Sequence, residues 1–208
     1  REQWNKVLRY IENLSDKSHL VLTGDFNHGV ISYAVNGYRH KPRQYFNYQM
    51  IVNDLKIKRI ILYPIEGNSY RGYMKINHIA TGEKFCYINT HLDHKGKEAQ
   101  KNGLKLIVDR IDAINPQGYP MVLTGDFNMT PDNTNLVELD SRMQSVRKIA
   151  QKTDNHDTFN GWGKGKGVID YIYVSNFASV PEYFTNVKEY AERPFVSDHY
   201  PIVAVLCF

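Results

Sequence analysis

The sequence has few cysteines and no long apolar run. Only Cys86 and Cys207 are cysteines, which argues against a disulfide framework and against a thiolate metal site. Both stand in strand-like apolar segments, so we expect buried, packed thiols. The uninterrupted apolar stretches are a few residues long, far shorter than a membrane span needs. We therefore expect a soluble protein, and we favour the cytoplasm.

The chain also lacks a large excess of one charge and a low-complexity linker. Its 26 basic and 22 acidic residues give a formal charge of +4, which suits a phosphate-bearing substrate but lacks the clustering of a nucleic-acid footprint. With 208 residues, of which 42% are apolar, we predict one domain over 1–208, with halves at 1–82 and 83–208. Arg1 stands inside an amphipathic pattern without an initiator methionine, so we expect a partial chain. The oligomeric state is left open.

One heptapeptide, VLTGDFN, occurs twice, at residues 21–27 and 122–128. An apolar run that ends in glycine predicts a buried strand, with the following carboxylate and carboxamide at its C-terminal edge. Sheet edges of this kind are where ligand sites are built. Apolar residues at helical spacing precede both copies, over 4–14 and 104–114. The repeated order of helix, loop, strand and GDFN suits two halves of one domain.

Periodicity and turn signals predict the remaining elements. Strands are expected at 59–62, 73–80, 84–90, 168–174 and 202–208, with a hairpin turn at 81–83, and helices at 43–55, 97–114 and 136–149. Residues 154–167 are rich in glycine, asparagine and lysine, so we predict a mobile surface loop. Its Trp162, Lys164 and Lys166 are compatible both with contact to a polyanion and with a plain solvated loop.

Four short motifs follow one another in the second part of the chain. They are Asn89-Thr90-His91-Leu92, Gly125-Asp126-Phe127-Asn128, Ile169-Asp170-Tyr171-Ile172 and Ser197-Asp198-His199-Tyr200-Pro201. In this order they resemble the C-terminal half of the endonuclease/exonuclease/phosphatase superfamily, whose fold is that of deoxyribonuclease I. The resemblance covers 73–208. It implies an α/β fold, namely a four-layered α/β/β/α sandwich of two packed mixed sheets.

The chemistry of phosphoester hydrolysis explains these residue types. The reaction needs an activated water, stabilisation of charge on the phosphoryl oxygens and a proton for the leaving oxygen, usually with a divalent metal. Two imidazoles and several carboxylates at one sheet edge can supply these functions. Oxygen ligands favour Mg2+ or Mn2+, and the absence of a His/Cys cluster argues against zinc.

The resemblance also implies a role for each motif residue. His199 is expected to be the general base or a phosphate ligand, held in tautomer and orientation by Asp170. Asp126 is expected to orient the attacking water.

Three further roles come from the same resemblance. Asn128 is expected to hold a phosphate oxygen through its amide. His91 is expected to stabilise the phosphoryl group or to protonate the leaving oxygen, and Asp198 to help bind the metal.

The first part of the chain departs from the family pattern. Family members carry an early strand that ends in asparagine and a second strand that ends in Gln-Glu, whose glutamate is the principal metal ligand; neither is found here. The helix at 4–14 and the first GDFN stand in their place. Because the two halves of the fold are related by a pseudo-twofold axis, one hypothesis is that Asp25 or Asn27 replaces the glutamate, with Asp25 as the candidate metal ligand.

A second hypothesis is that 1–82 itself resembles a C-terminal half of the family. Residues 75–80 then correspond to the Ile-Asp-Tyr-Ile strand, with Asn77 where the histidine-orienting aspartate belongs. No Ser-Asp-His motif follows, so a separate first site would be inactive.

Two functions from different classes therefore compete. The first is a metal-dependent phosphoesterase that hydrolyses phosphodiester or phosphomonoester bonds, with nucleic acid among its candidate substrates. The second is a catalytically silent module that binds phosphate or nucleic acid and lacks the metal-binding glutamate. We favour the enzyme, because the motifs around Asp126, Asp170 and His199 are intact.

Overall fold

The computed structural model describes residues 60–64, 70–77, 84–189, 194–195 and 197–208. The expected helices at 4–14 and 43–55 lie outside these residues, as do the turn at 81–83 and the first GDFN motif with Asp25. The two hypotheses for the first half therefore stay predictions.

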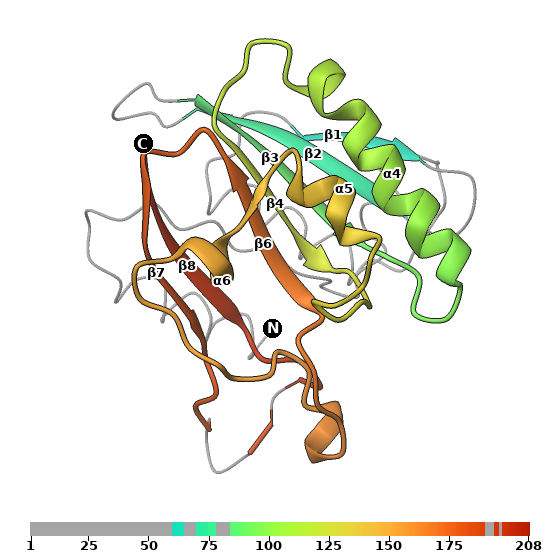
Figure 1. Ribbon diagram of the computed structural model, residues 1–208, viewed down its shortest axis with the longest axis vertical. Coiled ribbons are helices and arrows are strands. Elements are labelled where there is room, and N and C mark those ends of the chain that lie inside the picture. The colour runs from blue at the N-terminus through green and yellow to red at the C-terminus, as the bar shows by residue number, and fades with distance from the viewer. Residues whose placement is uncertain (1–59, 65–69, 78–83, 190–193, 196) are drawn as a thin grey trace, which may run out of the picture.

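A six-stranded mixed sheet forms the centre of the described region (Figure 1). Its strand order is β1 (Ile60–Pro64), β2 (Tyr70–Asn77), β3 (Lys84–His91), β4 (Met121–Asp126), β6 (Asp170–Ser175) and β5 (Gln144–Ser145). Only β3 and β4 run parallel to each other, and every other neighbouring pair is antiparallel. The expected hairpin is confirmed as the β2–β3 pair, with strand bounds shifted by a few residues.

A second sheet contains the antiparallel strands β7 (Ser179–Thr185) and β8 (Ile202–Cys207). Sequence periodicity did not predict β7. Its Pro181 cannot donate to a ladder, and the register shifts between Ser179 and Glu182, so the alternation that marks a strand is broken. The expectation of a buried Cys207 was wrong, because its side chain is exposed near the end of β8, whereas Cys86 in β3 is fully buried.

The helices lie mainly on one face of the large sheet. α4 (Lys97–Ile114) has the expected bounds, and its apolar stripe is buried. The expected helix at 136–149 is instead two short helices, α5 (Leu136–Asp140) and α6 (Val146–Ile149). The chain leaves the helical path between them because β5 pairs with β6 at the edge of the sheet. None of the helices in the described part is long and apolar enough to cross a membrane.

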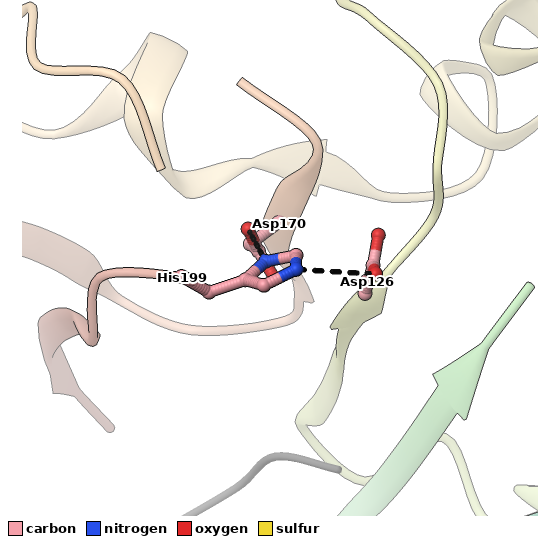
Figure 2. Close-up of side chains that lie close together, drawn as sticks. All are labelled: Asp126, Asp170 and His199. Atoms are coloured by element: carbon pink, nitrogen blue, oxygen red, sulfur yellow. Dashed lines mark hydrogen bonds and ion pairs between the residues drawn. The ribbon is translucent and has the colours of Figure 1, made fainter. Parts of the chain in front are cut away.

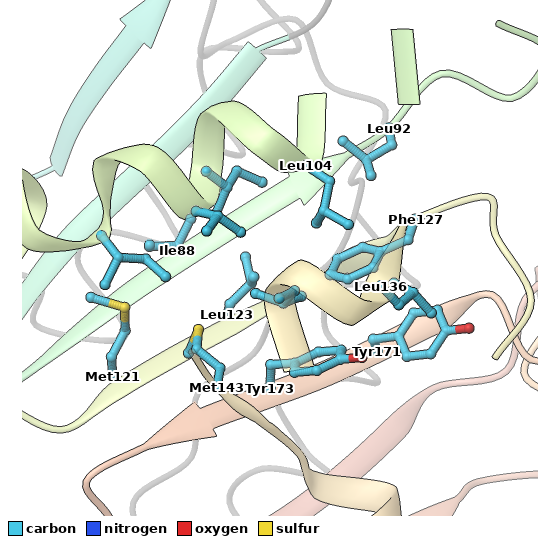
Figure 3. Close-up of a cluster of buried hydrophobic side chains, with 14 of the residues drawn as sticks. Ile88, Leu92, Leu104, Met121, Leu123, Phe127, Leu136, Met143, Tyr171 and Tyr173 are labelled. Carbon is cyan, nitrogen blue, oxygen red and sulfur yellow. The ribbon is translucent and has the colours of Figure 1, made fainter. Parts of the chain in front are cut away.

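Alternating side chains of the large sheet supply two cores. Cys86 and Ile88 of β3 face α4 and α5 in the first core, which also holds Phe127 (Figure 3). Phe85 and Tyr87 face the other way and pack with residues of β7. The large sheet thus lies between a helical layer and the second sheet, which gives an α/β/β arrangement. The second helical layer of the expected four-layered sandwich stays a prediction.

Candidate active site

Three strands of the large sheet bring three of the expected site residues into one row. His91, the last residue of β3, is paired with Asp126, the last residue of β4. Asp126 is paired in turn with Asp170, the first residue of β6. Because β3 and β4 are parallel and β6 is antiparallel to β4, all three side chains lie at the same edge of the sheet.

Two different structural constraints explain the glycine and the phenylalanine of the GDFN sequence. A β-carbon on Gly125 would lie 1.8 Å from the carbonyl oxygen of Thr90, so only glycine permits the close approach of β3 and β4 at this row. Phe127 is fully buried and stacks on Tyr171, with ring centroids 4.9 Å apart. The motif therefore fixes the end of β4 from both sides of Asp126.

Asn128 holds the Asp126 carboxylate in place. Its φ of 52° lies in the left-handed region, which asparagine tolerates better than most residues. Its backbone N–H donates to Asp126 Oδ1 at 2.8 Å, and its amide donates to Leu92 O at 3.0 Å and to Asp126 Oδ2 at 3.2 Å. The amide thus binds both the carboxylate and the loop that follows His91.

His199 reaches this row from the segment before β8. Its Nδ1 is 2.8 Å from Asp170 Oδ2, and its Nε2 is 3.8 Å from Asp126 Oδ2 (Figure 2). A carboxylate only accepts hydrogen bonds, so Nδ1 carries a proton and the lone pair of the neutral ring is on Nε2. The hydrogen bond to Asp170 raises the pKa of His199, although burial acts in the opposite direction.

Asp126 is the most constrained carboxylate of the group. Burial raises its pKa, and the nearby charge of Asp170 raises it further, while the N–H of Asn128 acts against both. His91 Nε2 lies 3.4 Å from Asp126 Oδ2, with the His91 side chain 46% exposed. Asp126 Oδ2 therefore lies near two imidazole Nε2 atoms, those of His91 and His199, which belong to different sequence motifs.

The loop at 154–167 is part of this site, and the expectation of a mobile surface loop was wrong for its central residues. Thr158 and Asn160 are almost fully buried. Thr158 Oγ1 accepts the N–H groups of Ile169 and Asp170, each at 3.0 Å. These hydrogen bonds fix the start of β6. The composition of the segment hid them, since glycine, asparagine and lysine also dominate solvated loops.

Asn160 ties the same loop to the segment that carries His199. Its backbone N–H donates to the carbonyl oxygen of Asp198 at 2.8 Å, and its amide donates to the carbonyl oxygen of Ser197 at 3.1 Å. Phe159 packs edge-on against the His199 ring, with centroids 5.1 Å apart. No sequence motif pointed to these contacts, because they join segments far apart in the chain.

Gln100 is a further residue that sequence analysis missed. This buried side chain in the first turns of α4 donates to Asp93 O at 2.7 Å and to Asn128 O at 3.0 Å. It therefore joins the loop after β3 to the loop after β4. A polar residue on an apolar helix face is the one signal that could have indicated it.

Comparison with known proteins identifies the family. The model of the Endonuclease/Exonuclease/phosphatase family matches residues 38–199. The chain belongs to this family. A search of curated proteins finds no match.

Solved structures of the family share the fold of the chain. An endonuclease/exonuclease/phosphatase from Bacteroides vulgatus is 29% identical, with a TM-score of 0.59, over 66% of this chain and 55% of that one. A mannosyl-6-phosphatase from Bacteroides thetaiotaomicron is 24% identical, with a TM-score of 0.59, over 67% and 57%. The human Nocturnin catalytic domain with bound sulfate is 21% identical, with a TM-score of 0.55, over 72% and 60%. The chain thus spans 55% to 60% of the length of these three structures.

Membership of the endonuclease/exonuclease/phosphatase family implies a divalent metal, and the donor chemistry of the described residues fits one. Asp126, Asp170 and His199 each offer a ligand atom, and these atoms lie within 4.8 Å of one another. Carboxylate oxygens are the ligands that Mg2+ and Mn2+ prefer, and a cation would offset the repulsion that raises the pKa of Asp126. Asp198 lies beside His199 in sequence but is not a member of this group, and Asp25 lies outside the described residues.

Proposed function

We propose that the chain is a divalent-metal-dependent phosphoesterase in which His199 and Asp170 act as one unit. The observation that carries this proposal is the pair of contacts of the His199 ring. Nδ1 is bound to Asp170, and Nε2 faces the Asp126 carboxylate at the edge of the sheet. A histidine held in this way can accept or donate a proton at Nε2 beside a phosphoryl group.

The residues of the row divide the chemistry among them. Asp126 orients the attacking water, and Asn128 fixes the carboxylate that does so. His91, which is half exposed on the other side of Asp126, is placed to donate a proton toward the leaving oxygen or to contact a phosphoryl oxygen. His199 acts as the general base or contacts the phosphoryl group through Nε2.

A bound metal would complete the site. Of the three clustered residues described above, Asp126 would help to hold it. The family resemblance adds the carboxylates of Asp198 and Asp25 as candidate ligands. Mg2+ or Mn2+ in this position would neutralise charge on the phosphoryl oxygens.

The proposal covers phosphodiesters and phosphomonoesters. The residues named above would act on the phosphate and its leaving oxygen, and this chemistry is common to the two classes. One of the similar structures is a mannosyl-6-phosphatase, so sugar phosphates are also candidate substrates. Nucleic acid is a candidate on the diester side.

Hydrolysis of two chromogenic substrates tests the proposal. Bis(p-nitrophenyl) phosphate and p-nitrophenyl phosphate are incubated with the chain in Mg2+, in Mn2+ and in EDTA. We expect turnover that requires metal and that falls roughly 100- to 10,000-fold in His199→Ala, the usual contribution of a general acid or base. His156→Ala is the matched control, since His156 is exposed and belongs to none of the hydrogen bonds of the His199 ring.

Three results would contradict the proposal. They are equal turnover in EDTA, equal turnover in His199→Ala, and no turnover in any metal. The last result, together with retained phosphate binding, would favour the silent phosphate-binding module.

A further inference from the structure

Trp162 combines an exposed aromatic side chain with a strained backbone conformation. Its side chain is 58% exposed, which is the largest exposure of any aromatic residue among the large exposed hydrophobics of the described region. Its backbone is also left-handed, with φ 59° and ψ 40°. A bulky residue in this conformation costs roughly 1–2 kcal/mol, and such strain tends to gather at functional sites.

The loop around Trp162 is rich in glycine, and its few other side chains are exposed. Gly161 and Gly163 on either side also have positive φ values, and a β-carbon at Gly165 would lie 2.3 Å from the ring of Phe159. The non-glycine residues over 161–167 are Trp162, Lys164 and Lys166. All three named side chains are exposed. Glycine at position 162 would avoid the strain, so we attribute the presence of tryptophan there to a role of its indole side chain.

Hydrogen bonds hold Trp162 close to the catalytic histidine. The N–H of Trp162 donates to Asn160 Oδ1 at 2.9 Å. The N–H groups of Asn160 and Gly161 both donate to the carbonyl oxygen of Asp198, at 2.8 and 3.0 Å, and Asp198 immediately precedes His199. In Figure 1 the short helical turn at Gly161–Gly163 stands out beyond the sheet edge at which β4 ends and β6 begins. The backbone of Trp162 is thus tied to the segment that carries His199, and its side chain is exposed.

We propose that Trp162 is a stacking platform for a base of single-stranded nucleic acid whose phosphodiester lies at the His199–Asp170 pair. Lys164 and Lys166 then neutralise a neighbouring phosphate. An aromatic face beside exposed ammonium groups is the pattern that binds bases and backbone together, whereas a sugar monophosphate offers only one phosphate and no base. This inference rests on the proposed function, because it assigns a substrate class to the same site.

Binding of a labelled oligonucleotide tests the platform without requiring turnover. Every variant is made in the His199→Ala chain, and the anisotropy of a fluorescein-labelled short oligothymidylate is titrated in Mg2+. Trp162→Ala should raise Kd about tenfold, the typical contribution of one stacked base, and Trp162→Phe should restore most of the affinity. Val137→Ala is the control, since Val137 is an exposed apolar residue of α5.

The salt dependence of the same titration tests the lysines. Lys164→Ala should reduce the slope of log Kd against log salt by about one ion. Lys84→Ala should leave the slope unchanged, because Lys84 lies at the opposite end of β3 from His91.

The outcomes separate this inference from the proposed function. Cleavage of the chromogenic diester without oligothymidylate binding would overturn the inference and leave the function standing. Binding that needs Trp162 in a chain that cleaves nothing would support the inference and contradict the function. A loss of affinity in Trp162→Ala that is matched by unfolding, or that Trp162→Phe does not repair, would assign the indole a structural role and overturn the inference.

Discussion

At the scale of single residues, the two nitrogens of His199 have separate tasks. Nδ1 donates to the Asp170 carboxylate, which raises the pKa of the ring and stabilises the imidazolium form. Nε2 faces Asp126, and in the proposed mechanism it is the atom that accepts or donates the proton. A base with a raised pKa is a stronger proton acceptor, but a larger share of it is protonated at a given pH, so the pKa sets the lower end of the active pH range.

Asp170→Asn should therefore change the pH profile in a defined direction. Asparagine has the shape of aspartate but lacks the charge, so the pKa of His199 falls. If His199 acts as the base, the acid limb of the profile of kcat/KM moves to lower pH, while kcat falls by roughly 10- to 100-fold because the ring is less well held and less basic. The measurement is kcat/KM for bis(p-nitrophenyl) phosphate across the pH range, with His156→Ala as control. If the acid limb does not move in Asp170→Asn, that limb does not reflect the protonation of His199.

The sequence predicted that four candidate site residues lie together, but it did not predict their supporting contacts. His91, Asp126, Asp170 and His199 stand in recognisable motifs, and the structure brings all four to one sheet edge. The hydrogen bonds of Gln100 to Asp93 O and Asn128 O join separate loops, so no local pattern predicts them.

At the scale of secondary-structure elements, Gly125 determines how closely β3 and β4 approach. The two strands are in register from Cys86 and Met121 to His91 and Asp126. The Thr90 carbonyl lies where the β-carbon of any other residue at 125 would be. The glycine of the GDFN motif therefore allows β3 and β4 to approach closely enough to place His91 beside Asp126.

Gly125→Ala should lower stability much more than Gly118→Ala. Both glycines have positive φ, but nothing lies within 4 Å of a β-carbon at Gly118. We expect a loss of about 3 kcal/mol or more at 125, where strands must separate, against about 1 kcal/mol at 118, where only the backbone conformation is strained. Urea unfolding followed by circular dichroism measures both free energies. Similar losses would show that the backbone conformation, and not the contact with Thr90, requires Gly125.

Element prediction succeeded where one periodicity runs without interruption. α4 shows this best, because its long apolar stripe gave its bounds at both ends. It failed at 136–149, where a two-residue pairing with β6 interrupts the helical pattern, and at β7, where Pro181 and a register shift break the alternation. In both places tertiary pairing overrides the local pattern.

At the scale of the whole molecule, the site depends on the packing of two sheets. Asp126 and Asp170 belong to the large sheet, whereas His199 precedes β8 of the small one. The core between the sheets, which includes Tyr87 and Tyr183, sets the distance between these partners. Small shifts in this packing would move His199 relative to Asp170, and misplacement by an ångström can cost a large part of the rate.

The family and an α/β fold with a mixed sheet could be predicted from four motifs in order, because each motif ends or begins a strand at the same edge. The second helical layer, the single domain over 1–208 and the replacement of the family glutamate by Asp25 could not be tested in the same way. They depend on residues 1–59, which lie outside the described part of the chain.

A double-mutant cycle on His199 and Asp170 tests the central claim most directly. Bis(p-nitrophenyl) phosphate hydrolysis in Mg2+ is measured for the unchanged chain, Asp170→Asn, His199→Ala and the double variant. If Asp170 acts only through His199, the double variant should lose no more activity than His199→Ala alone. Losses that multiply, or an unchanged chain without turnover, would contradict the account.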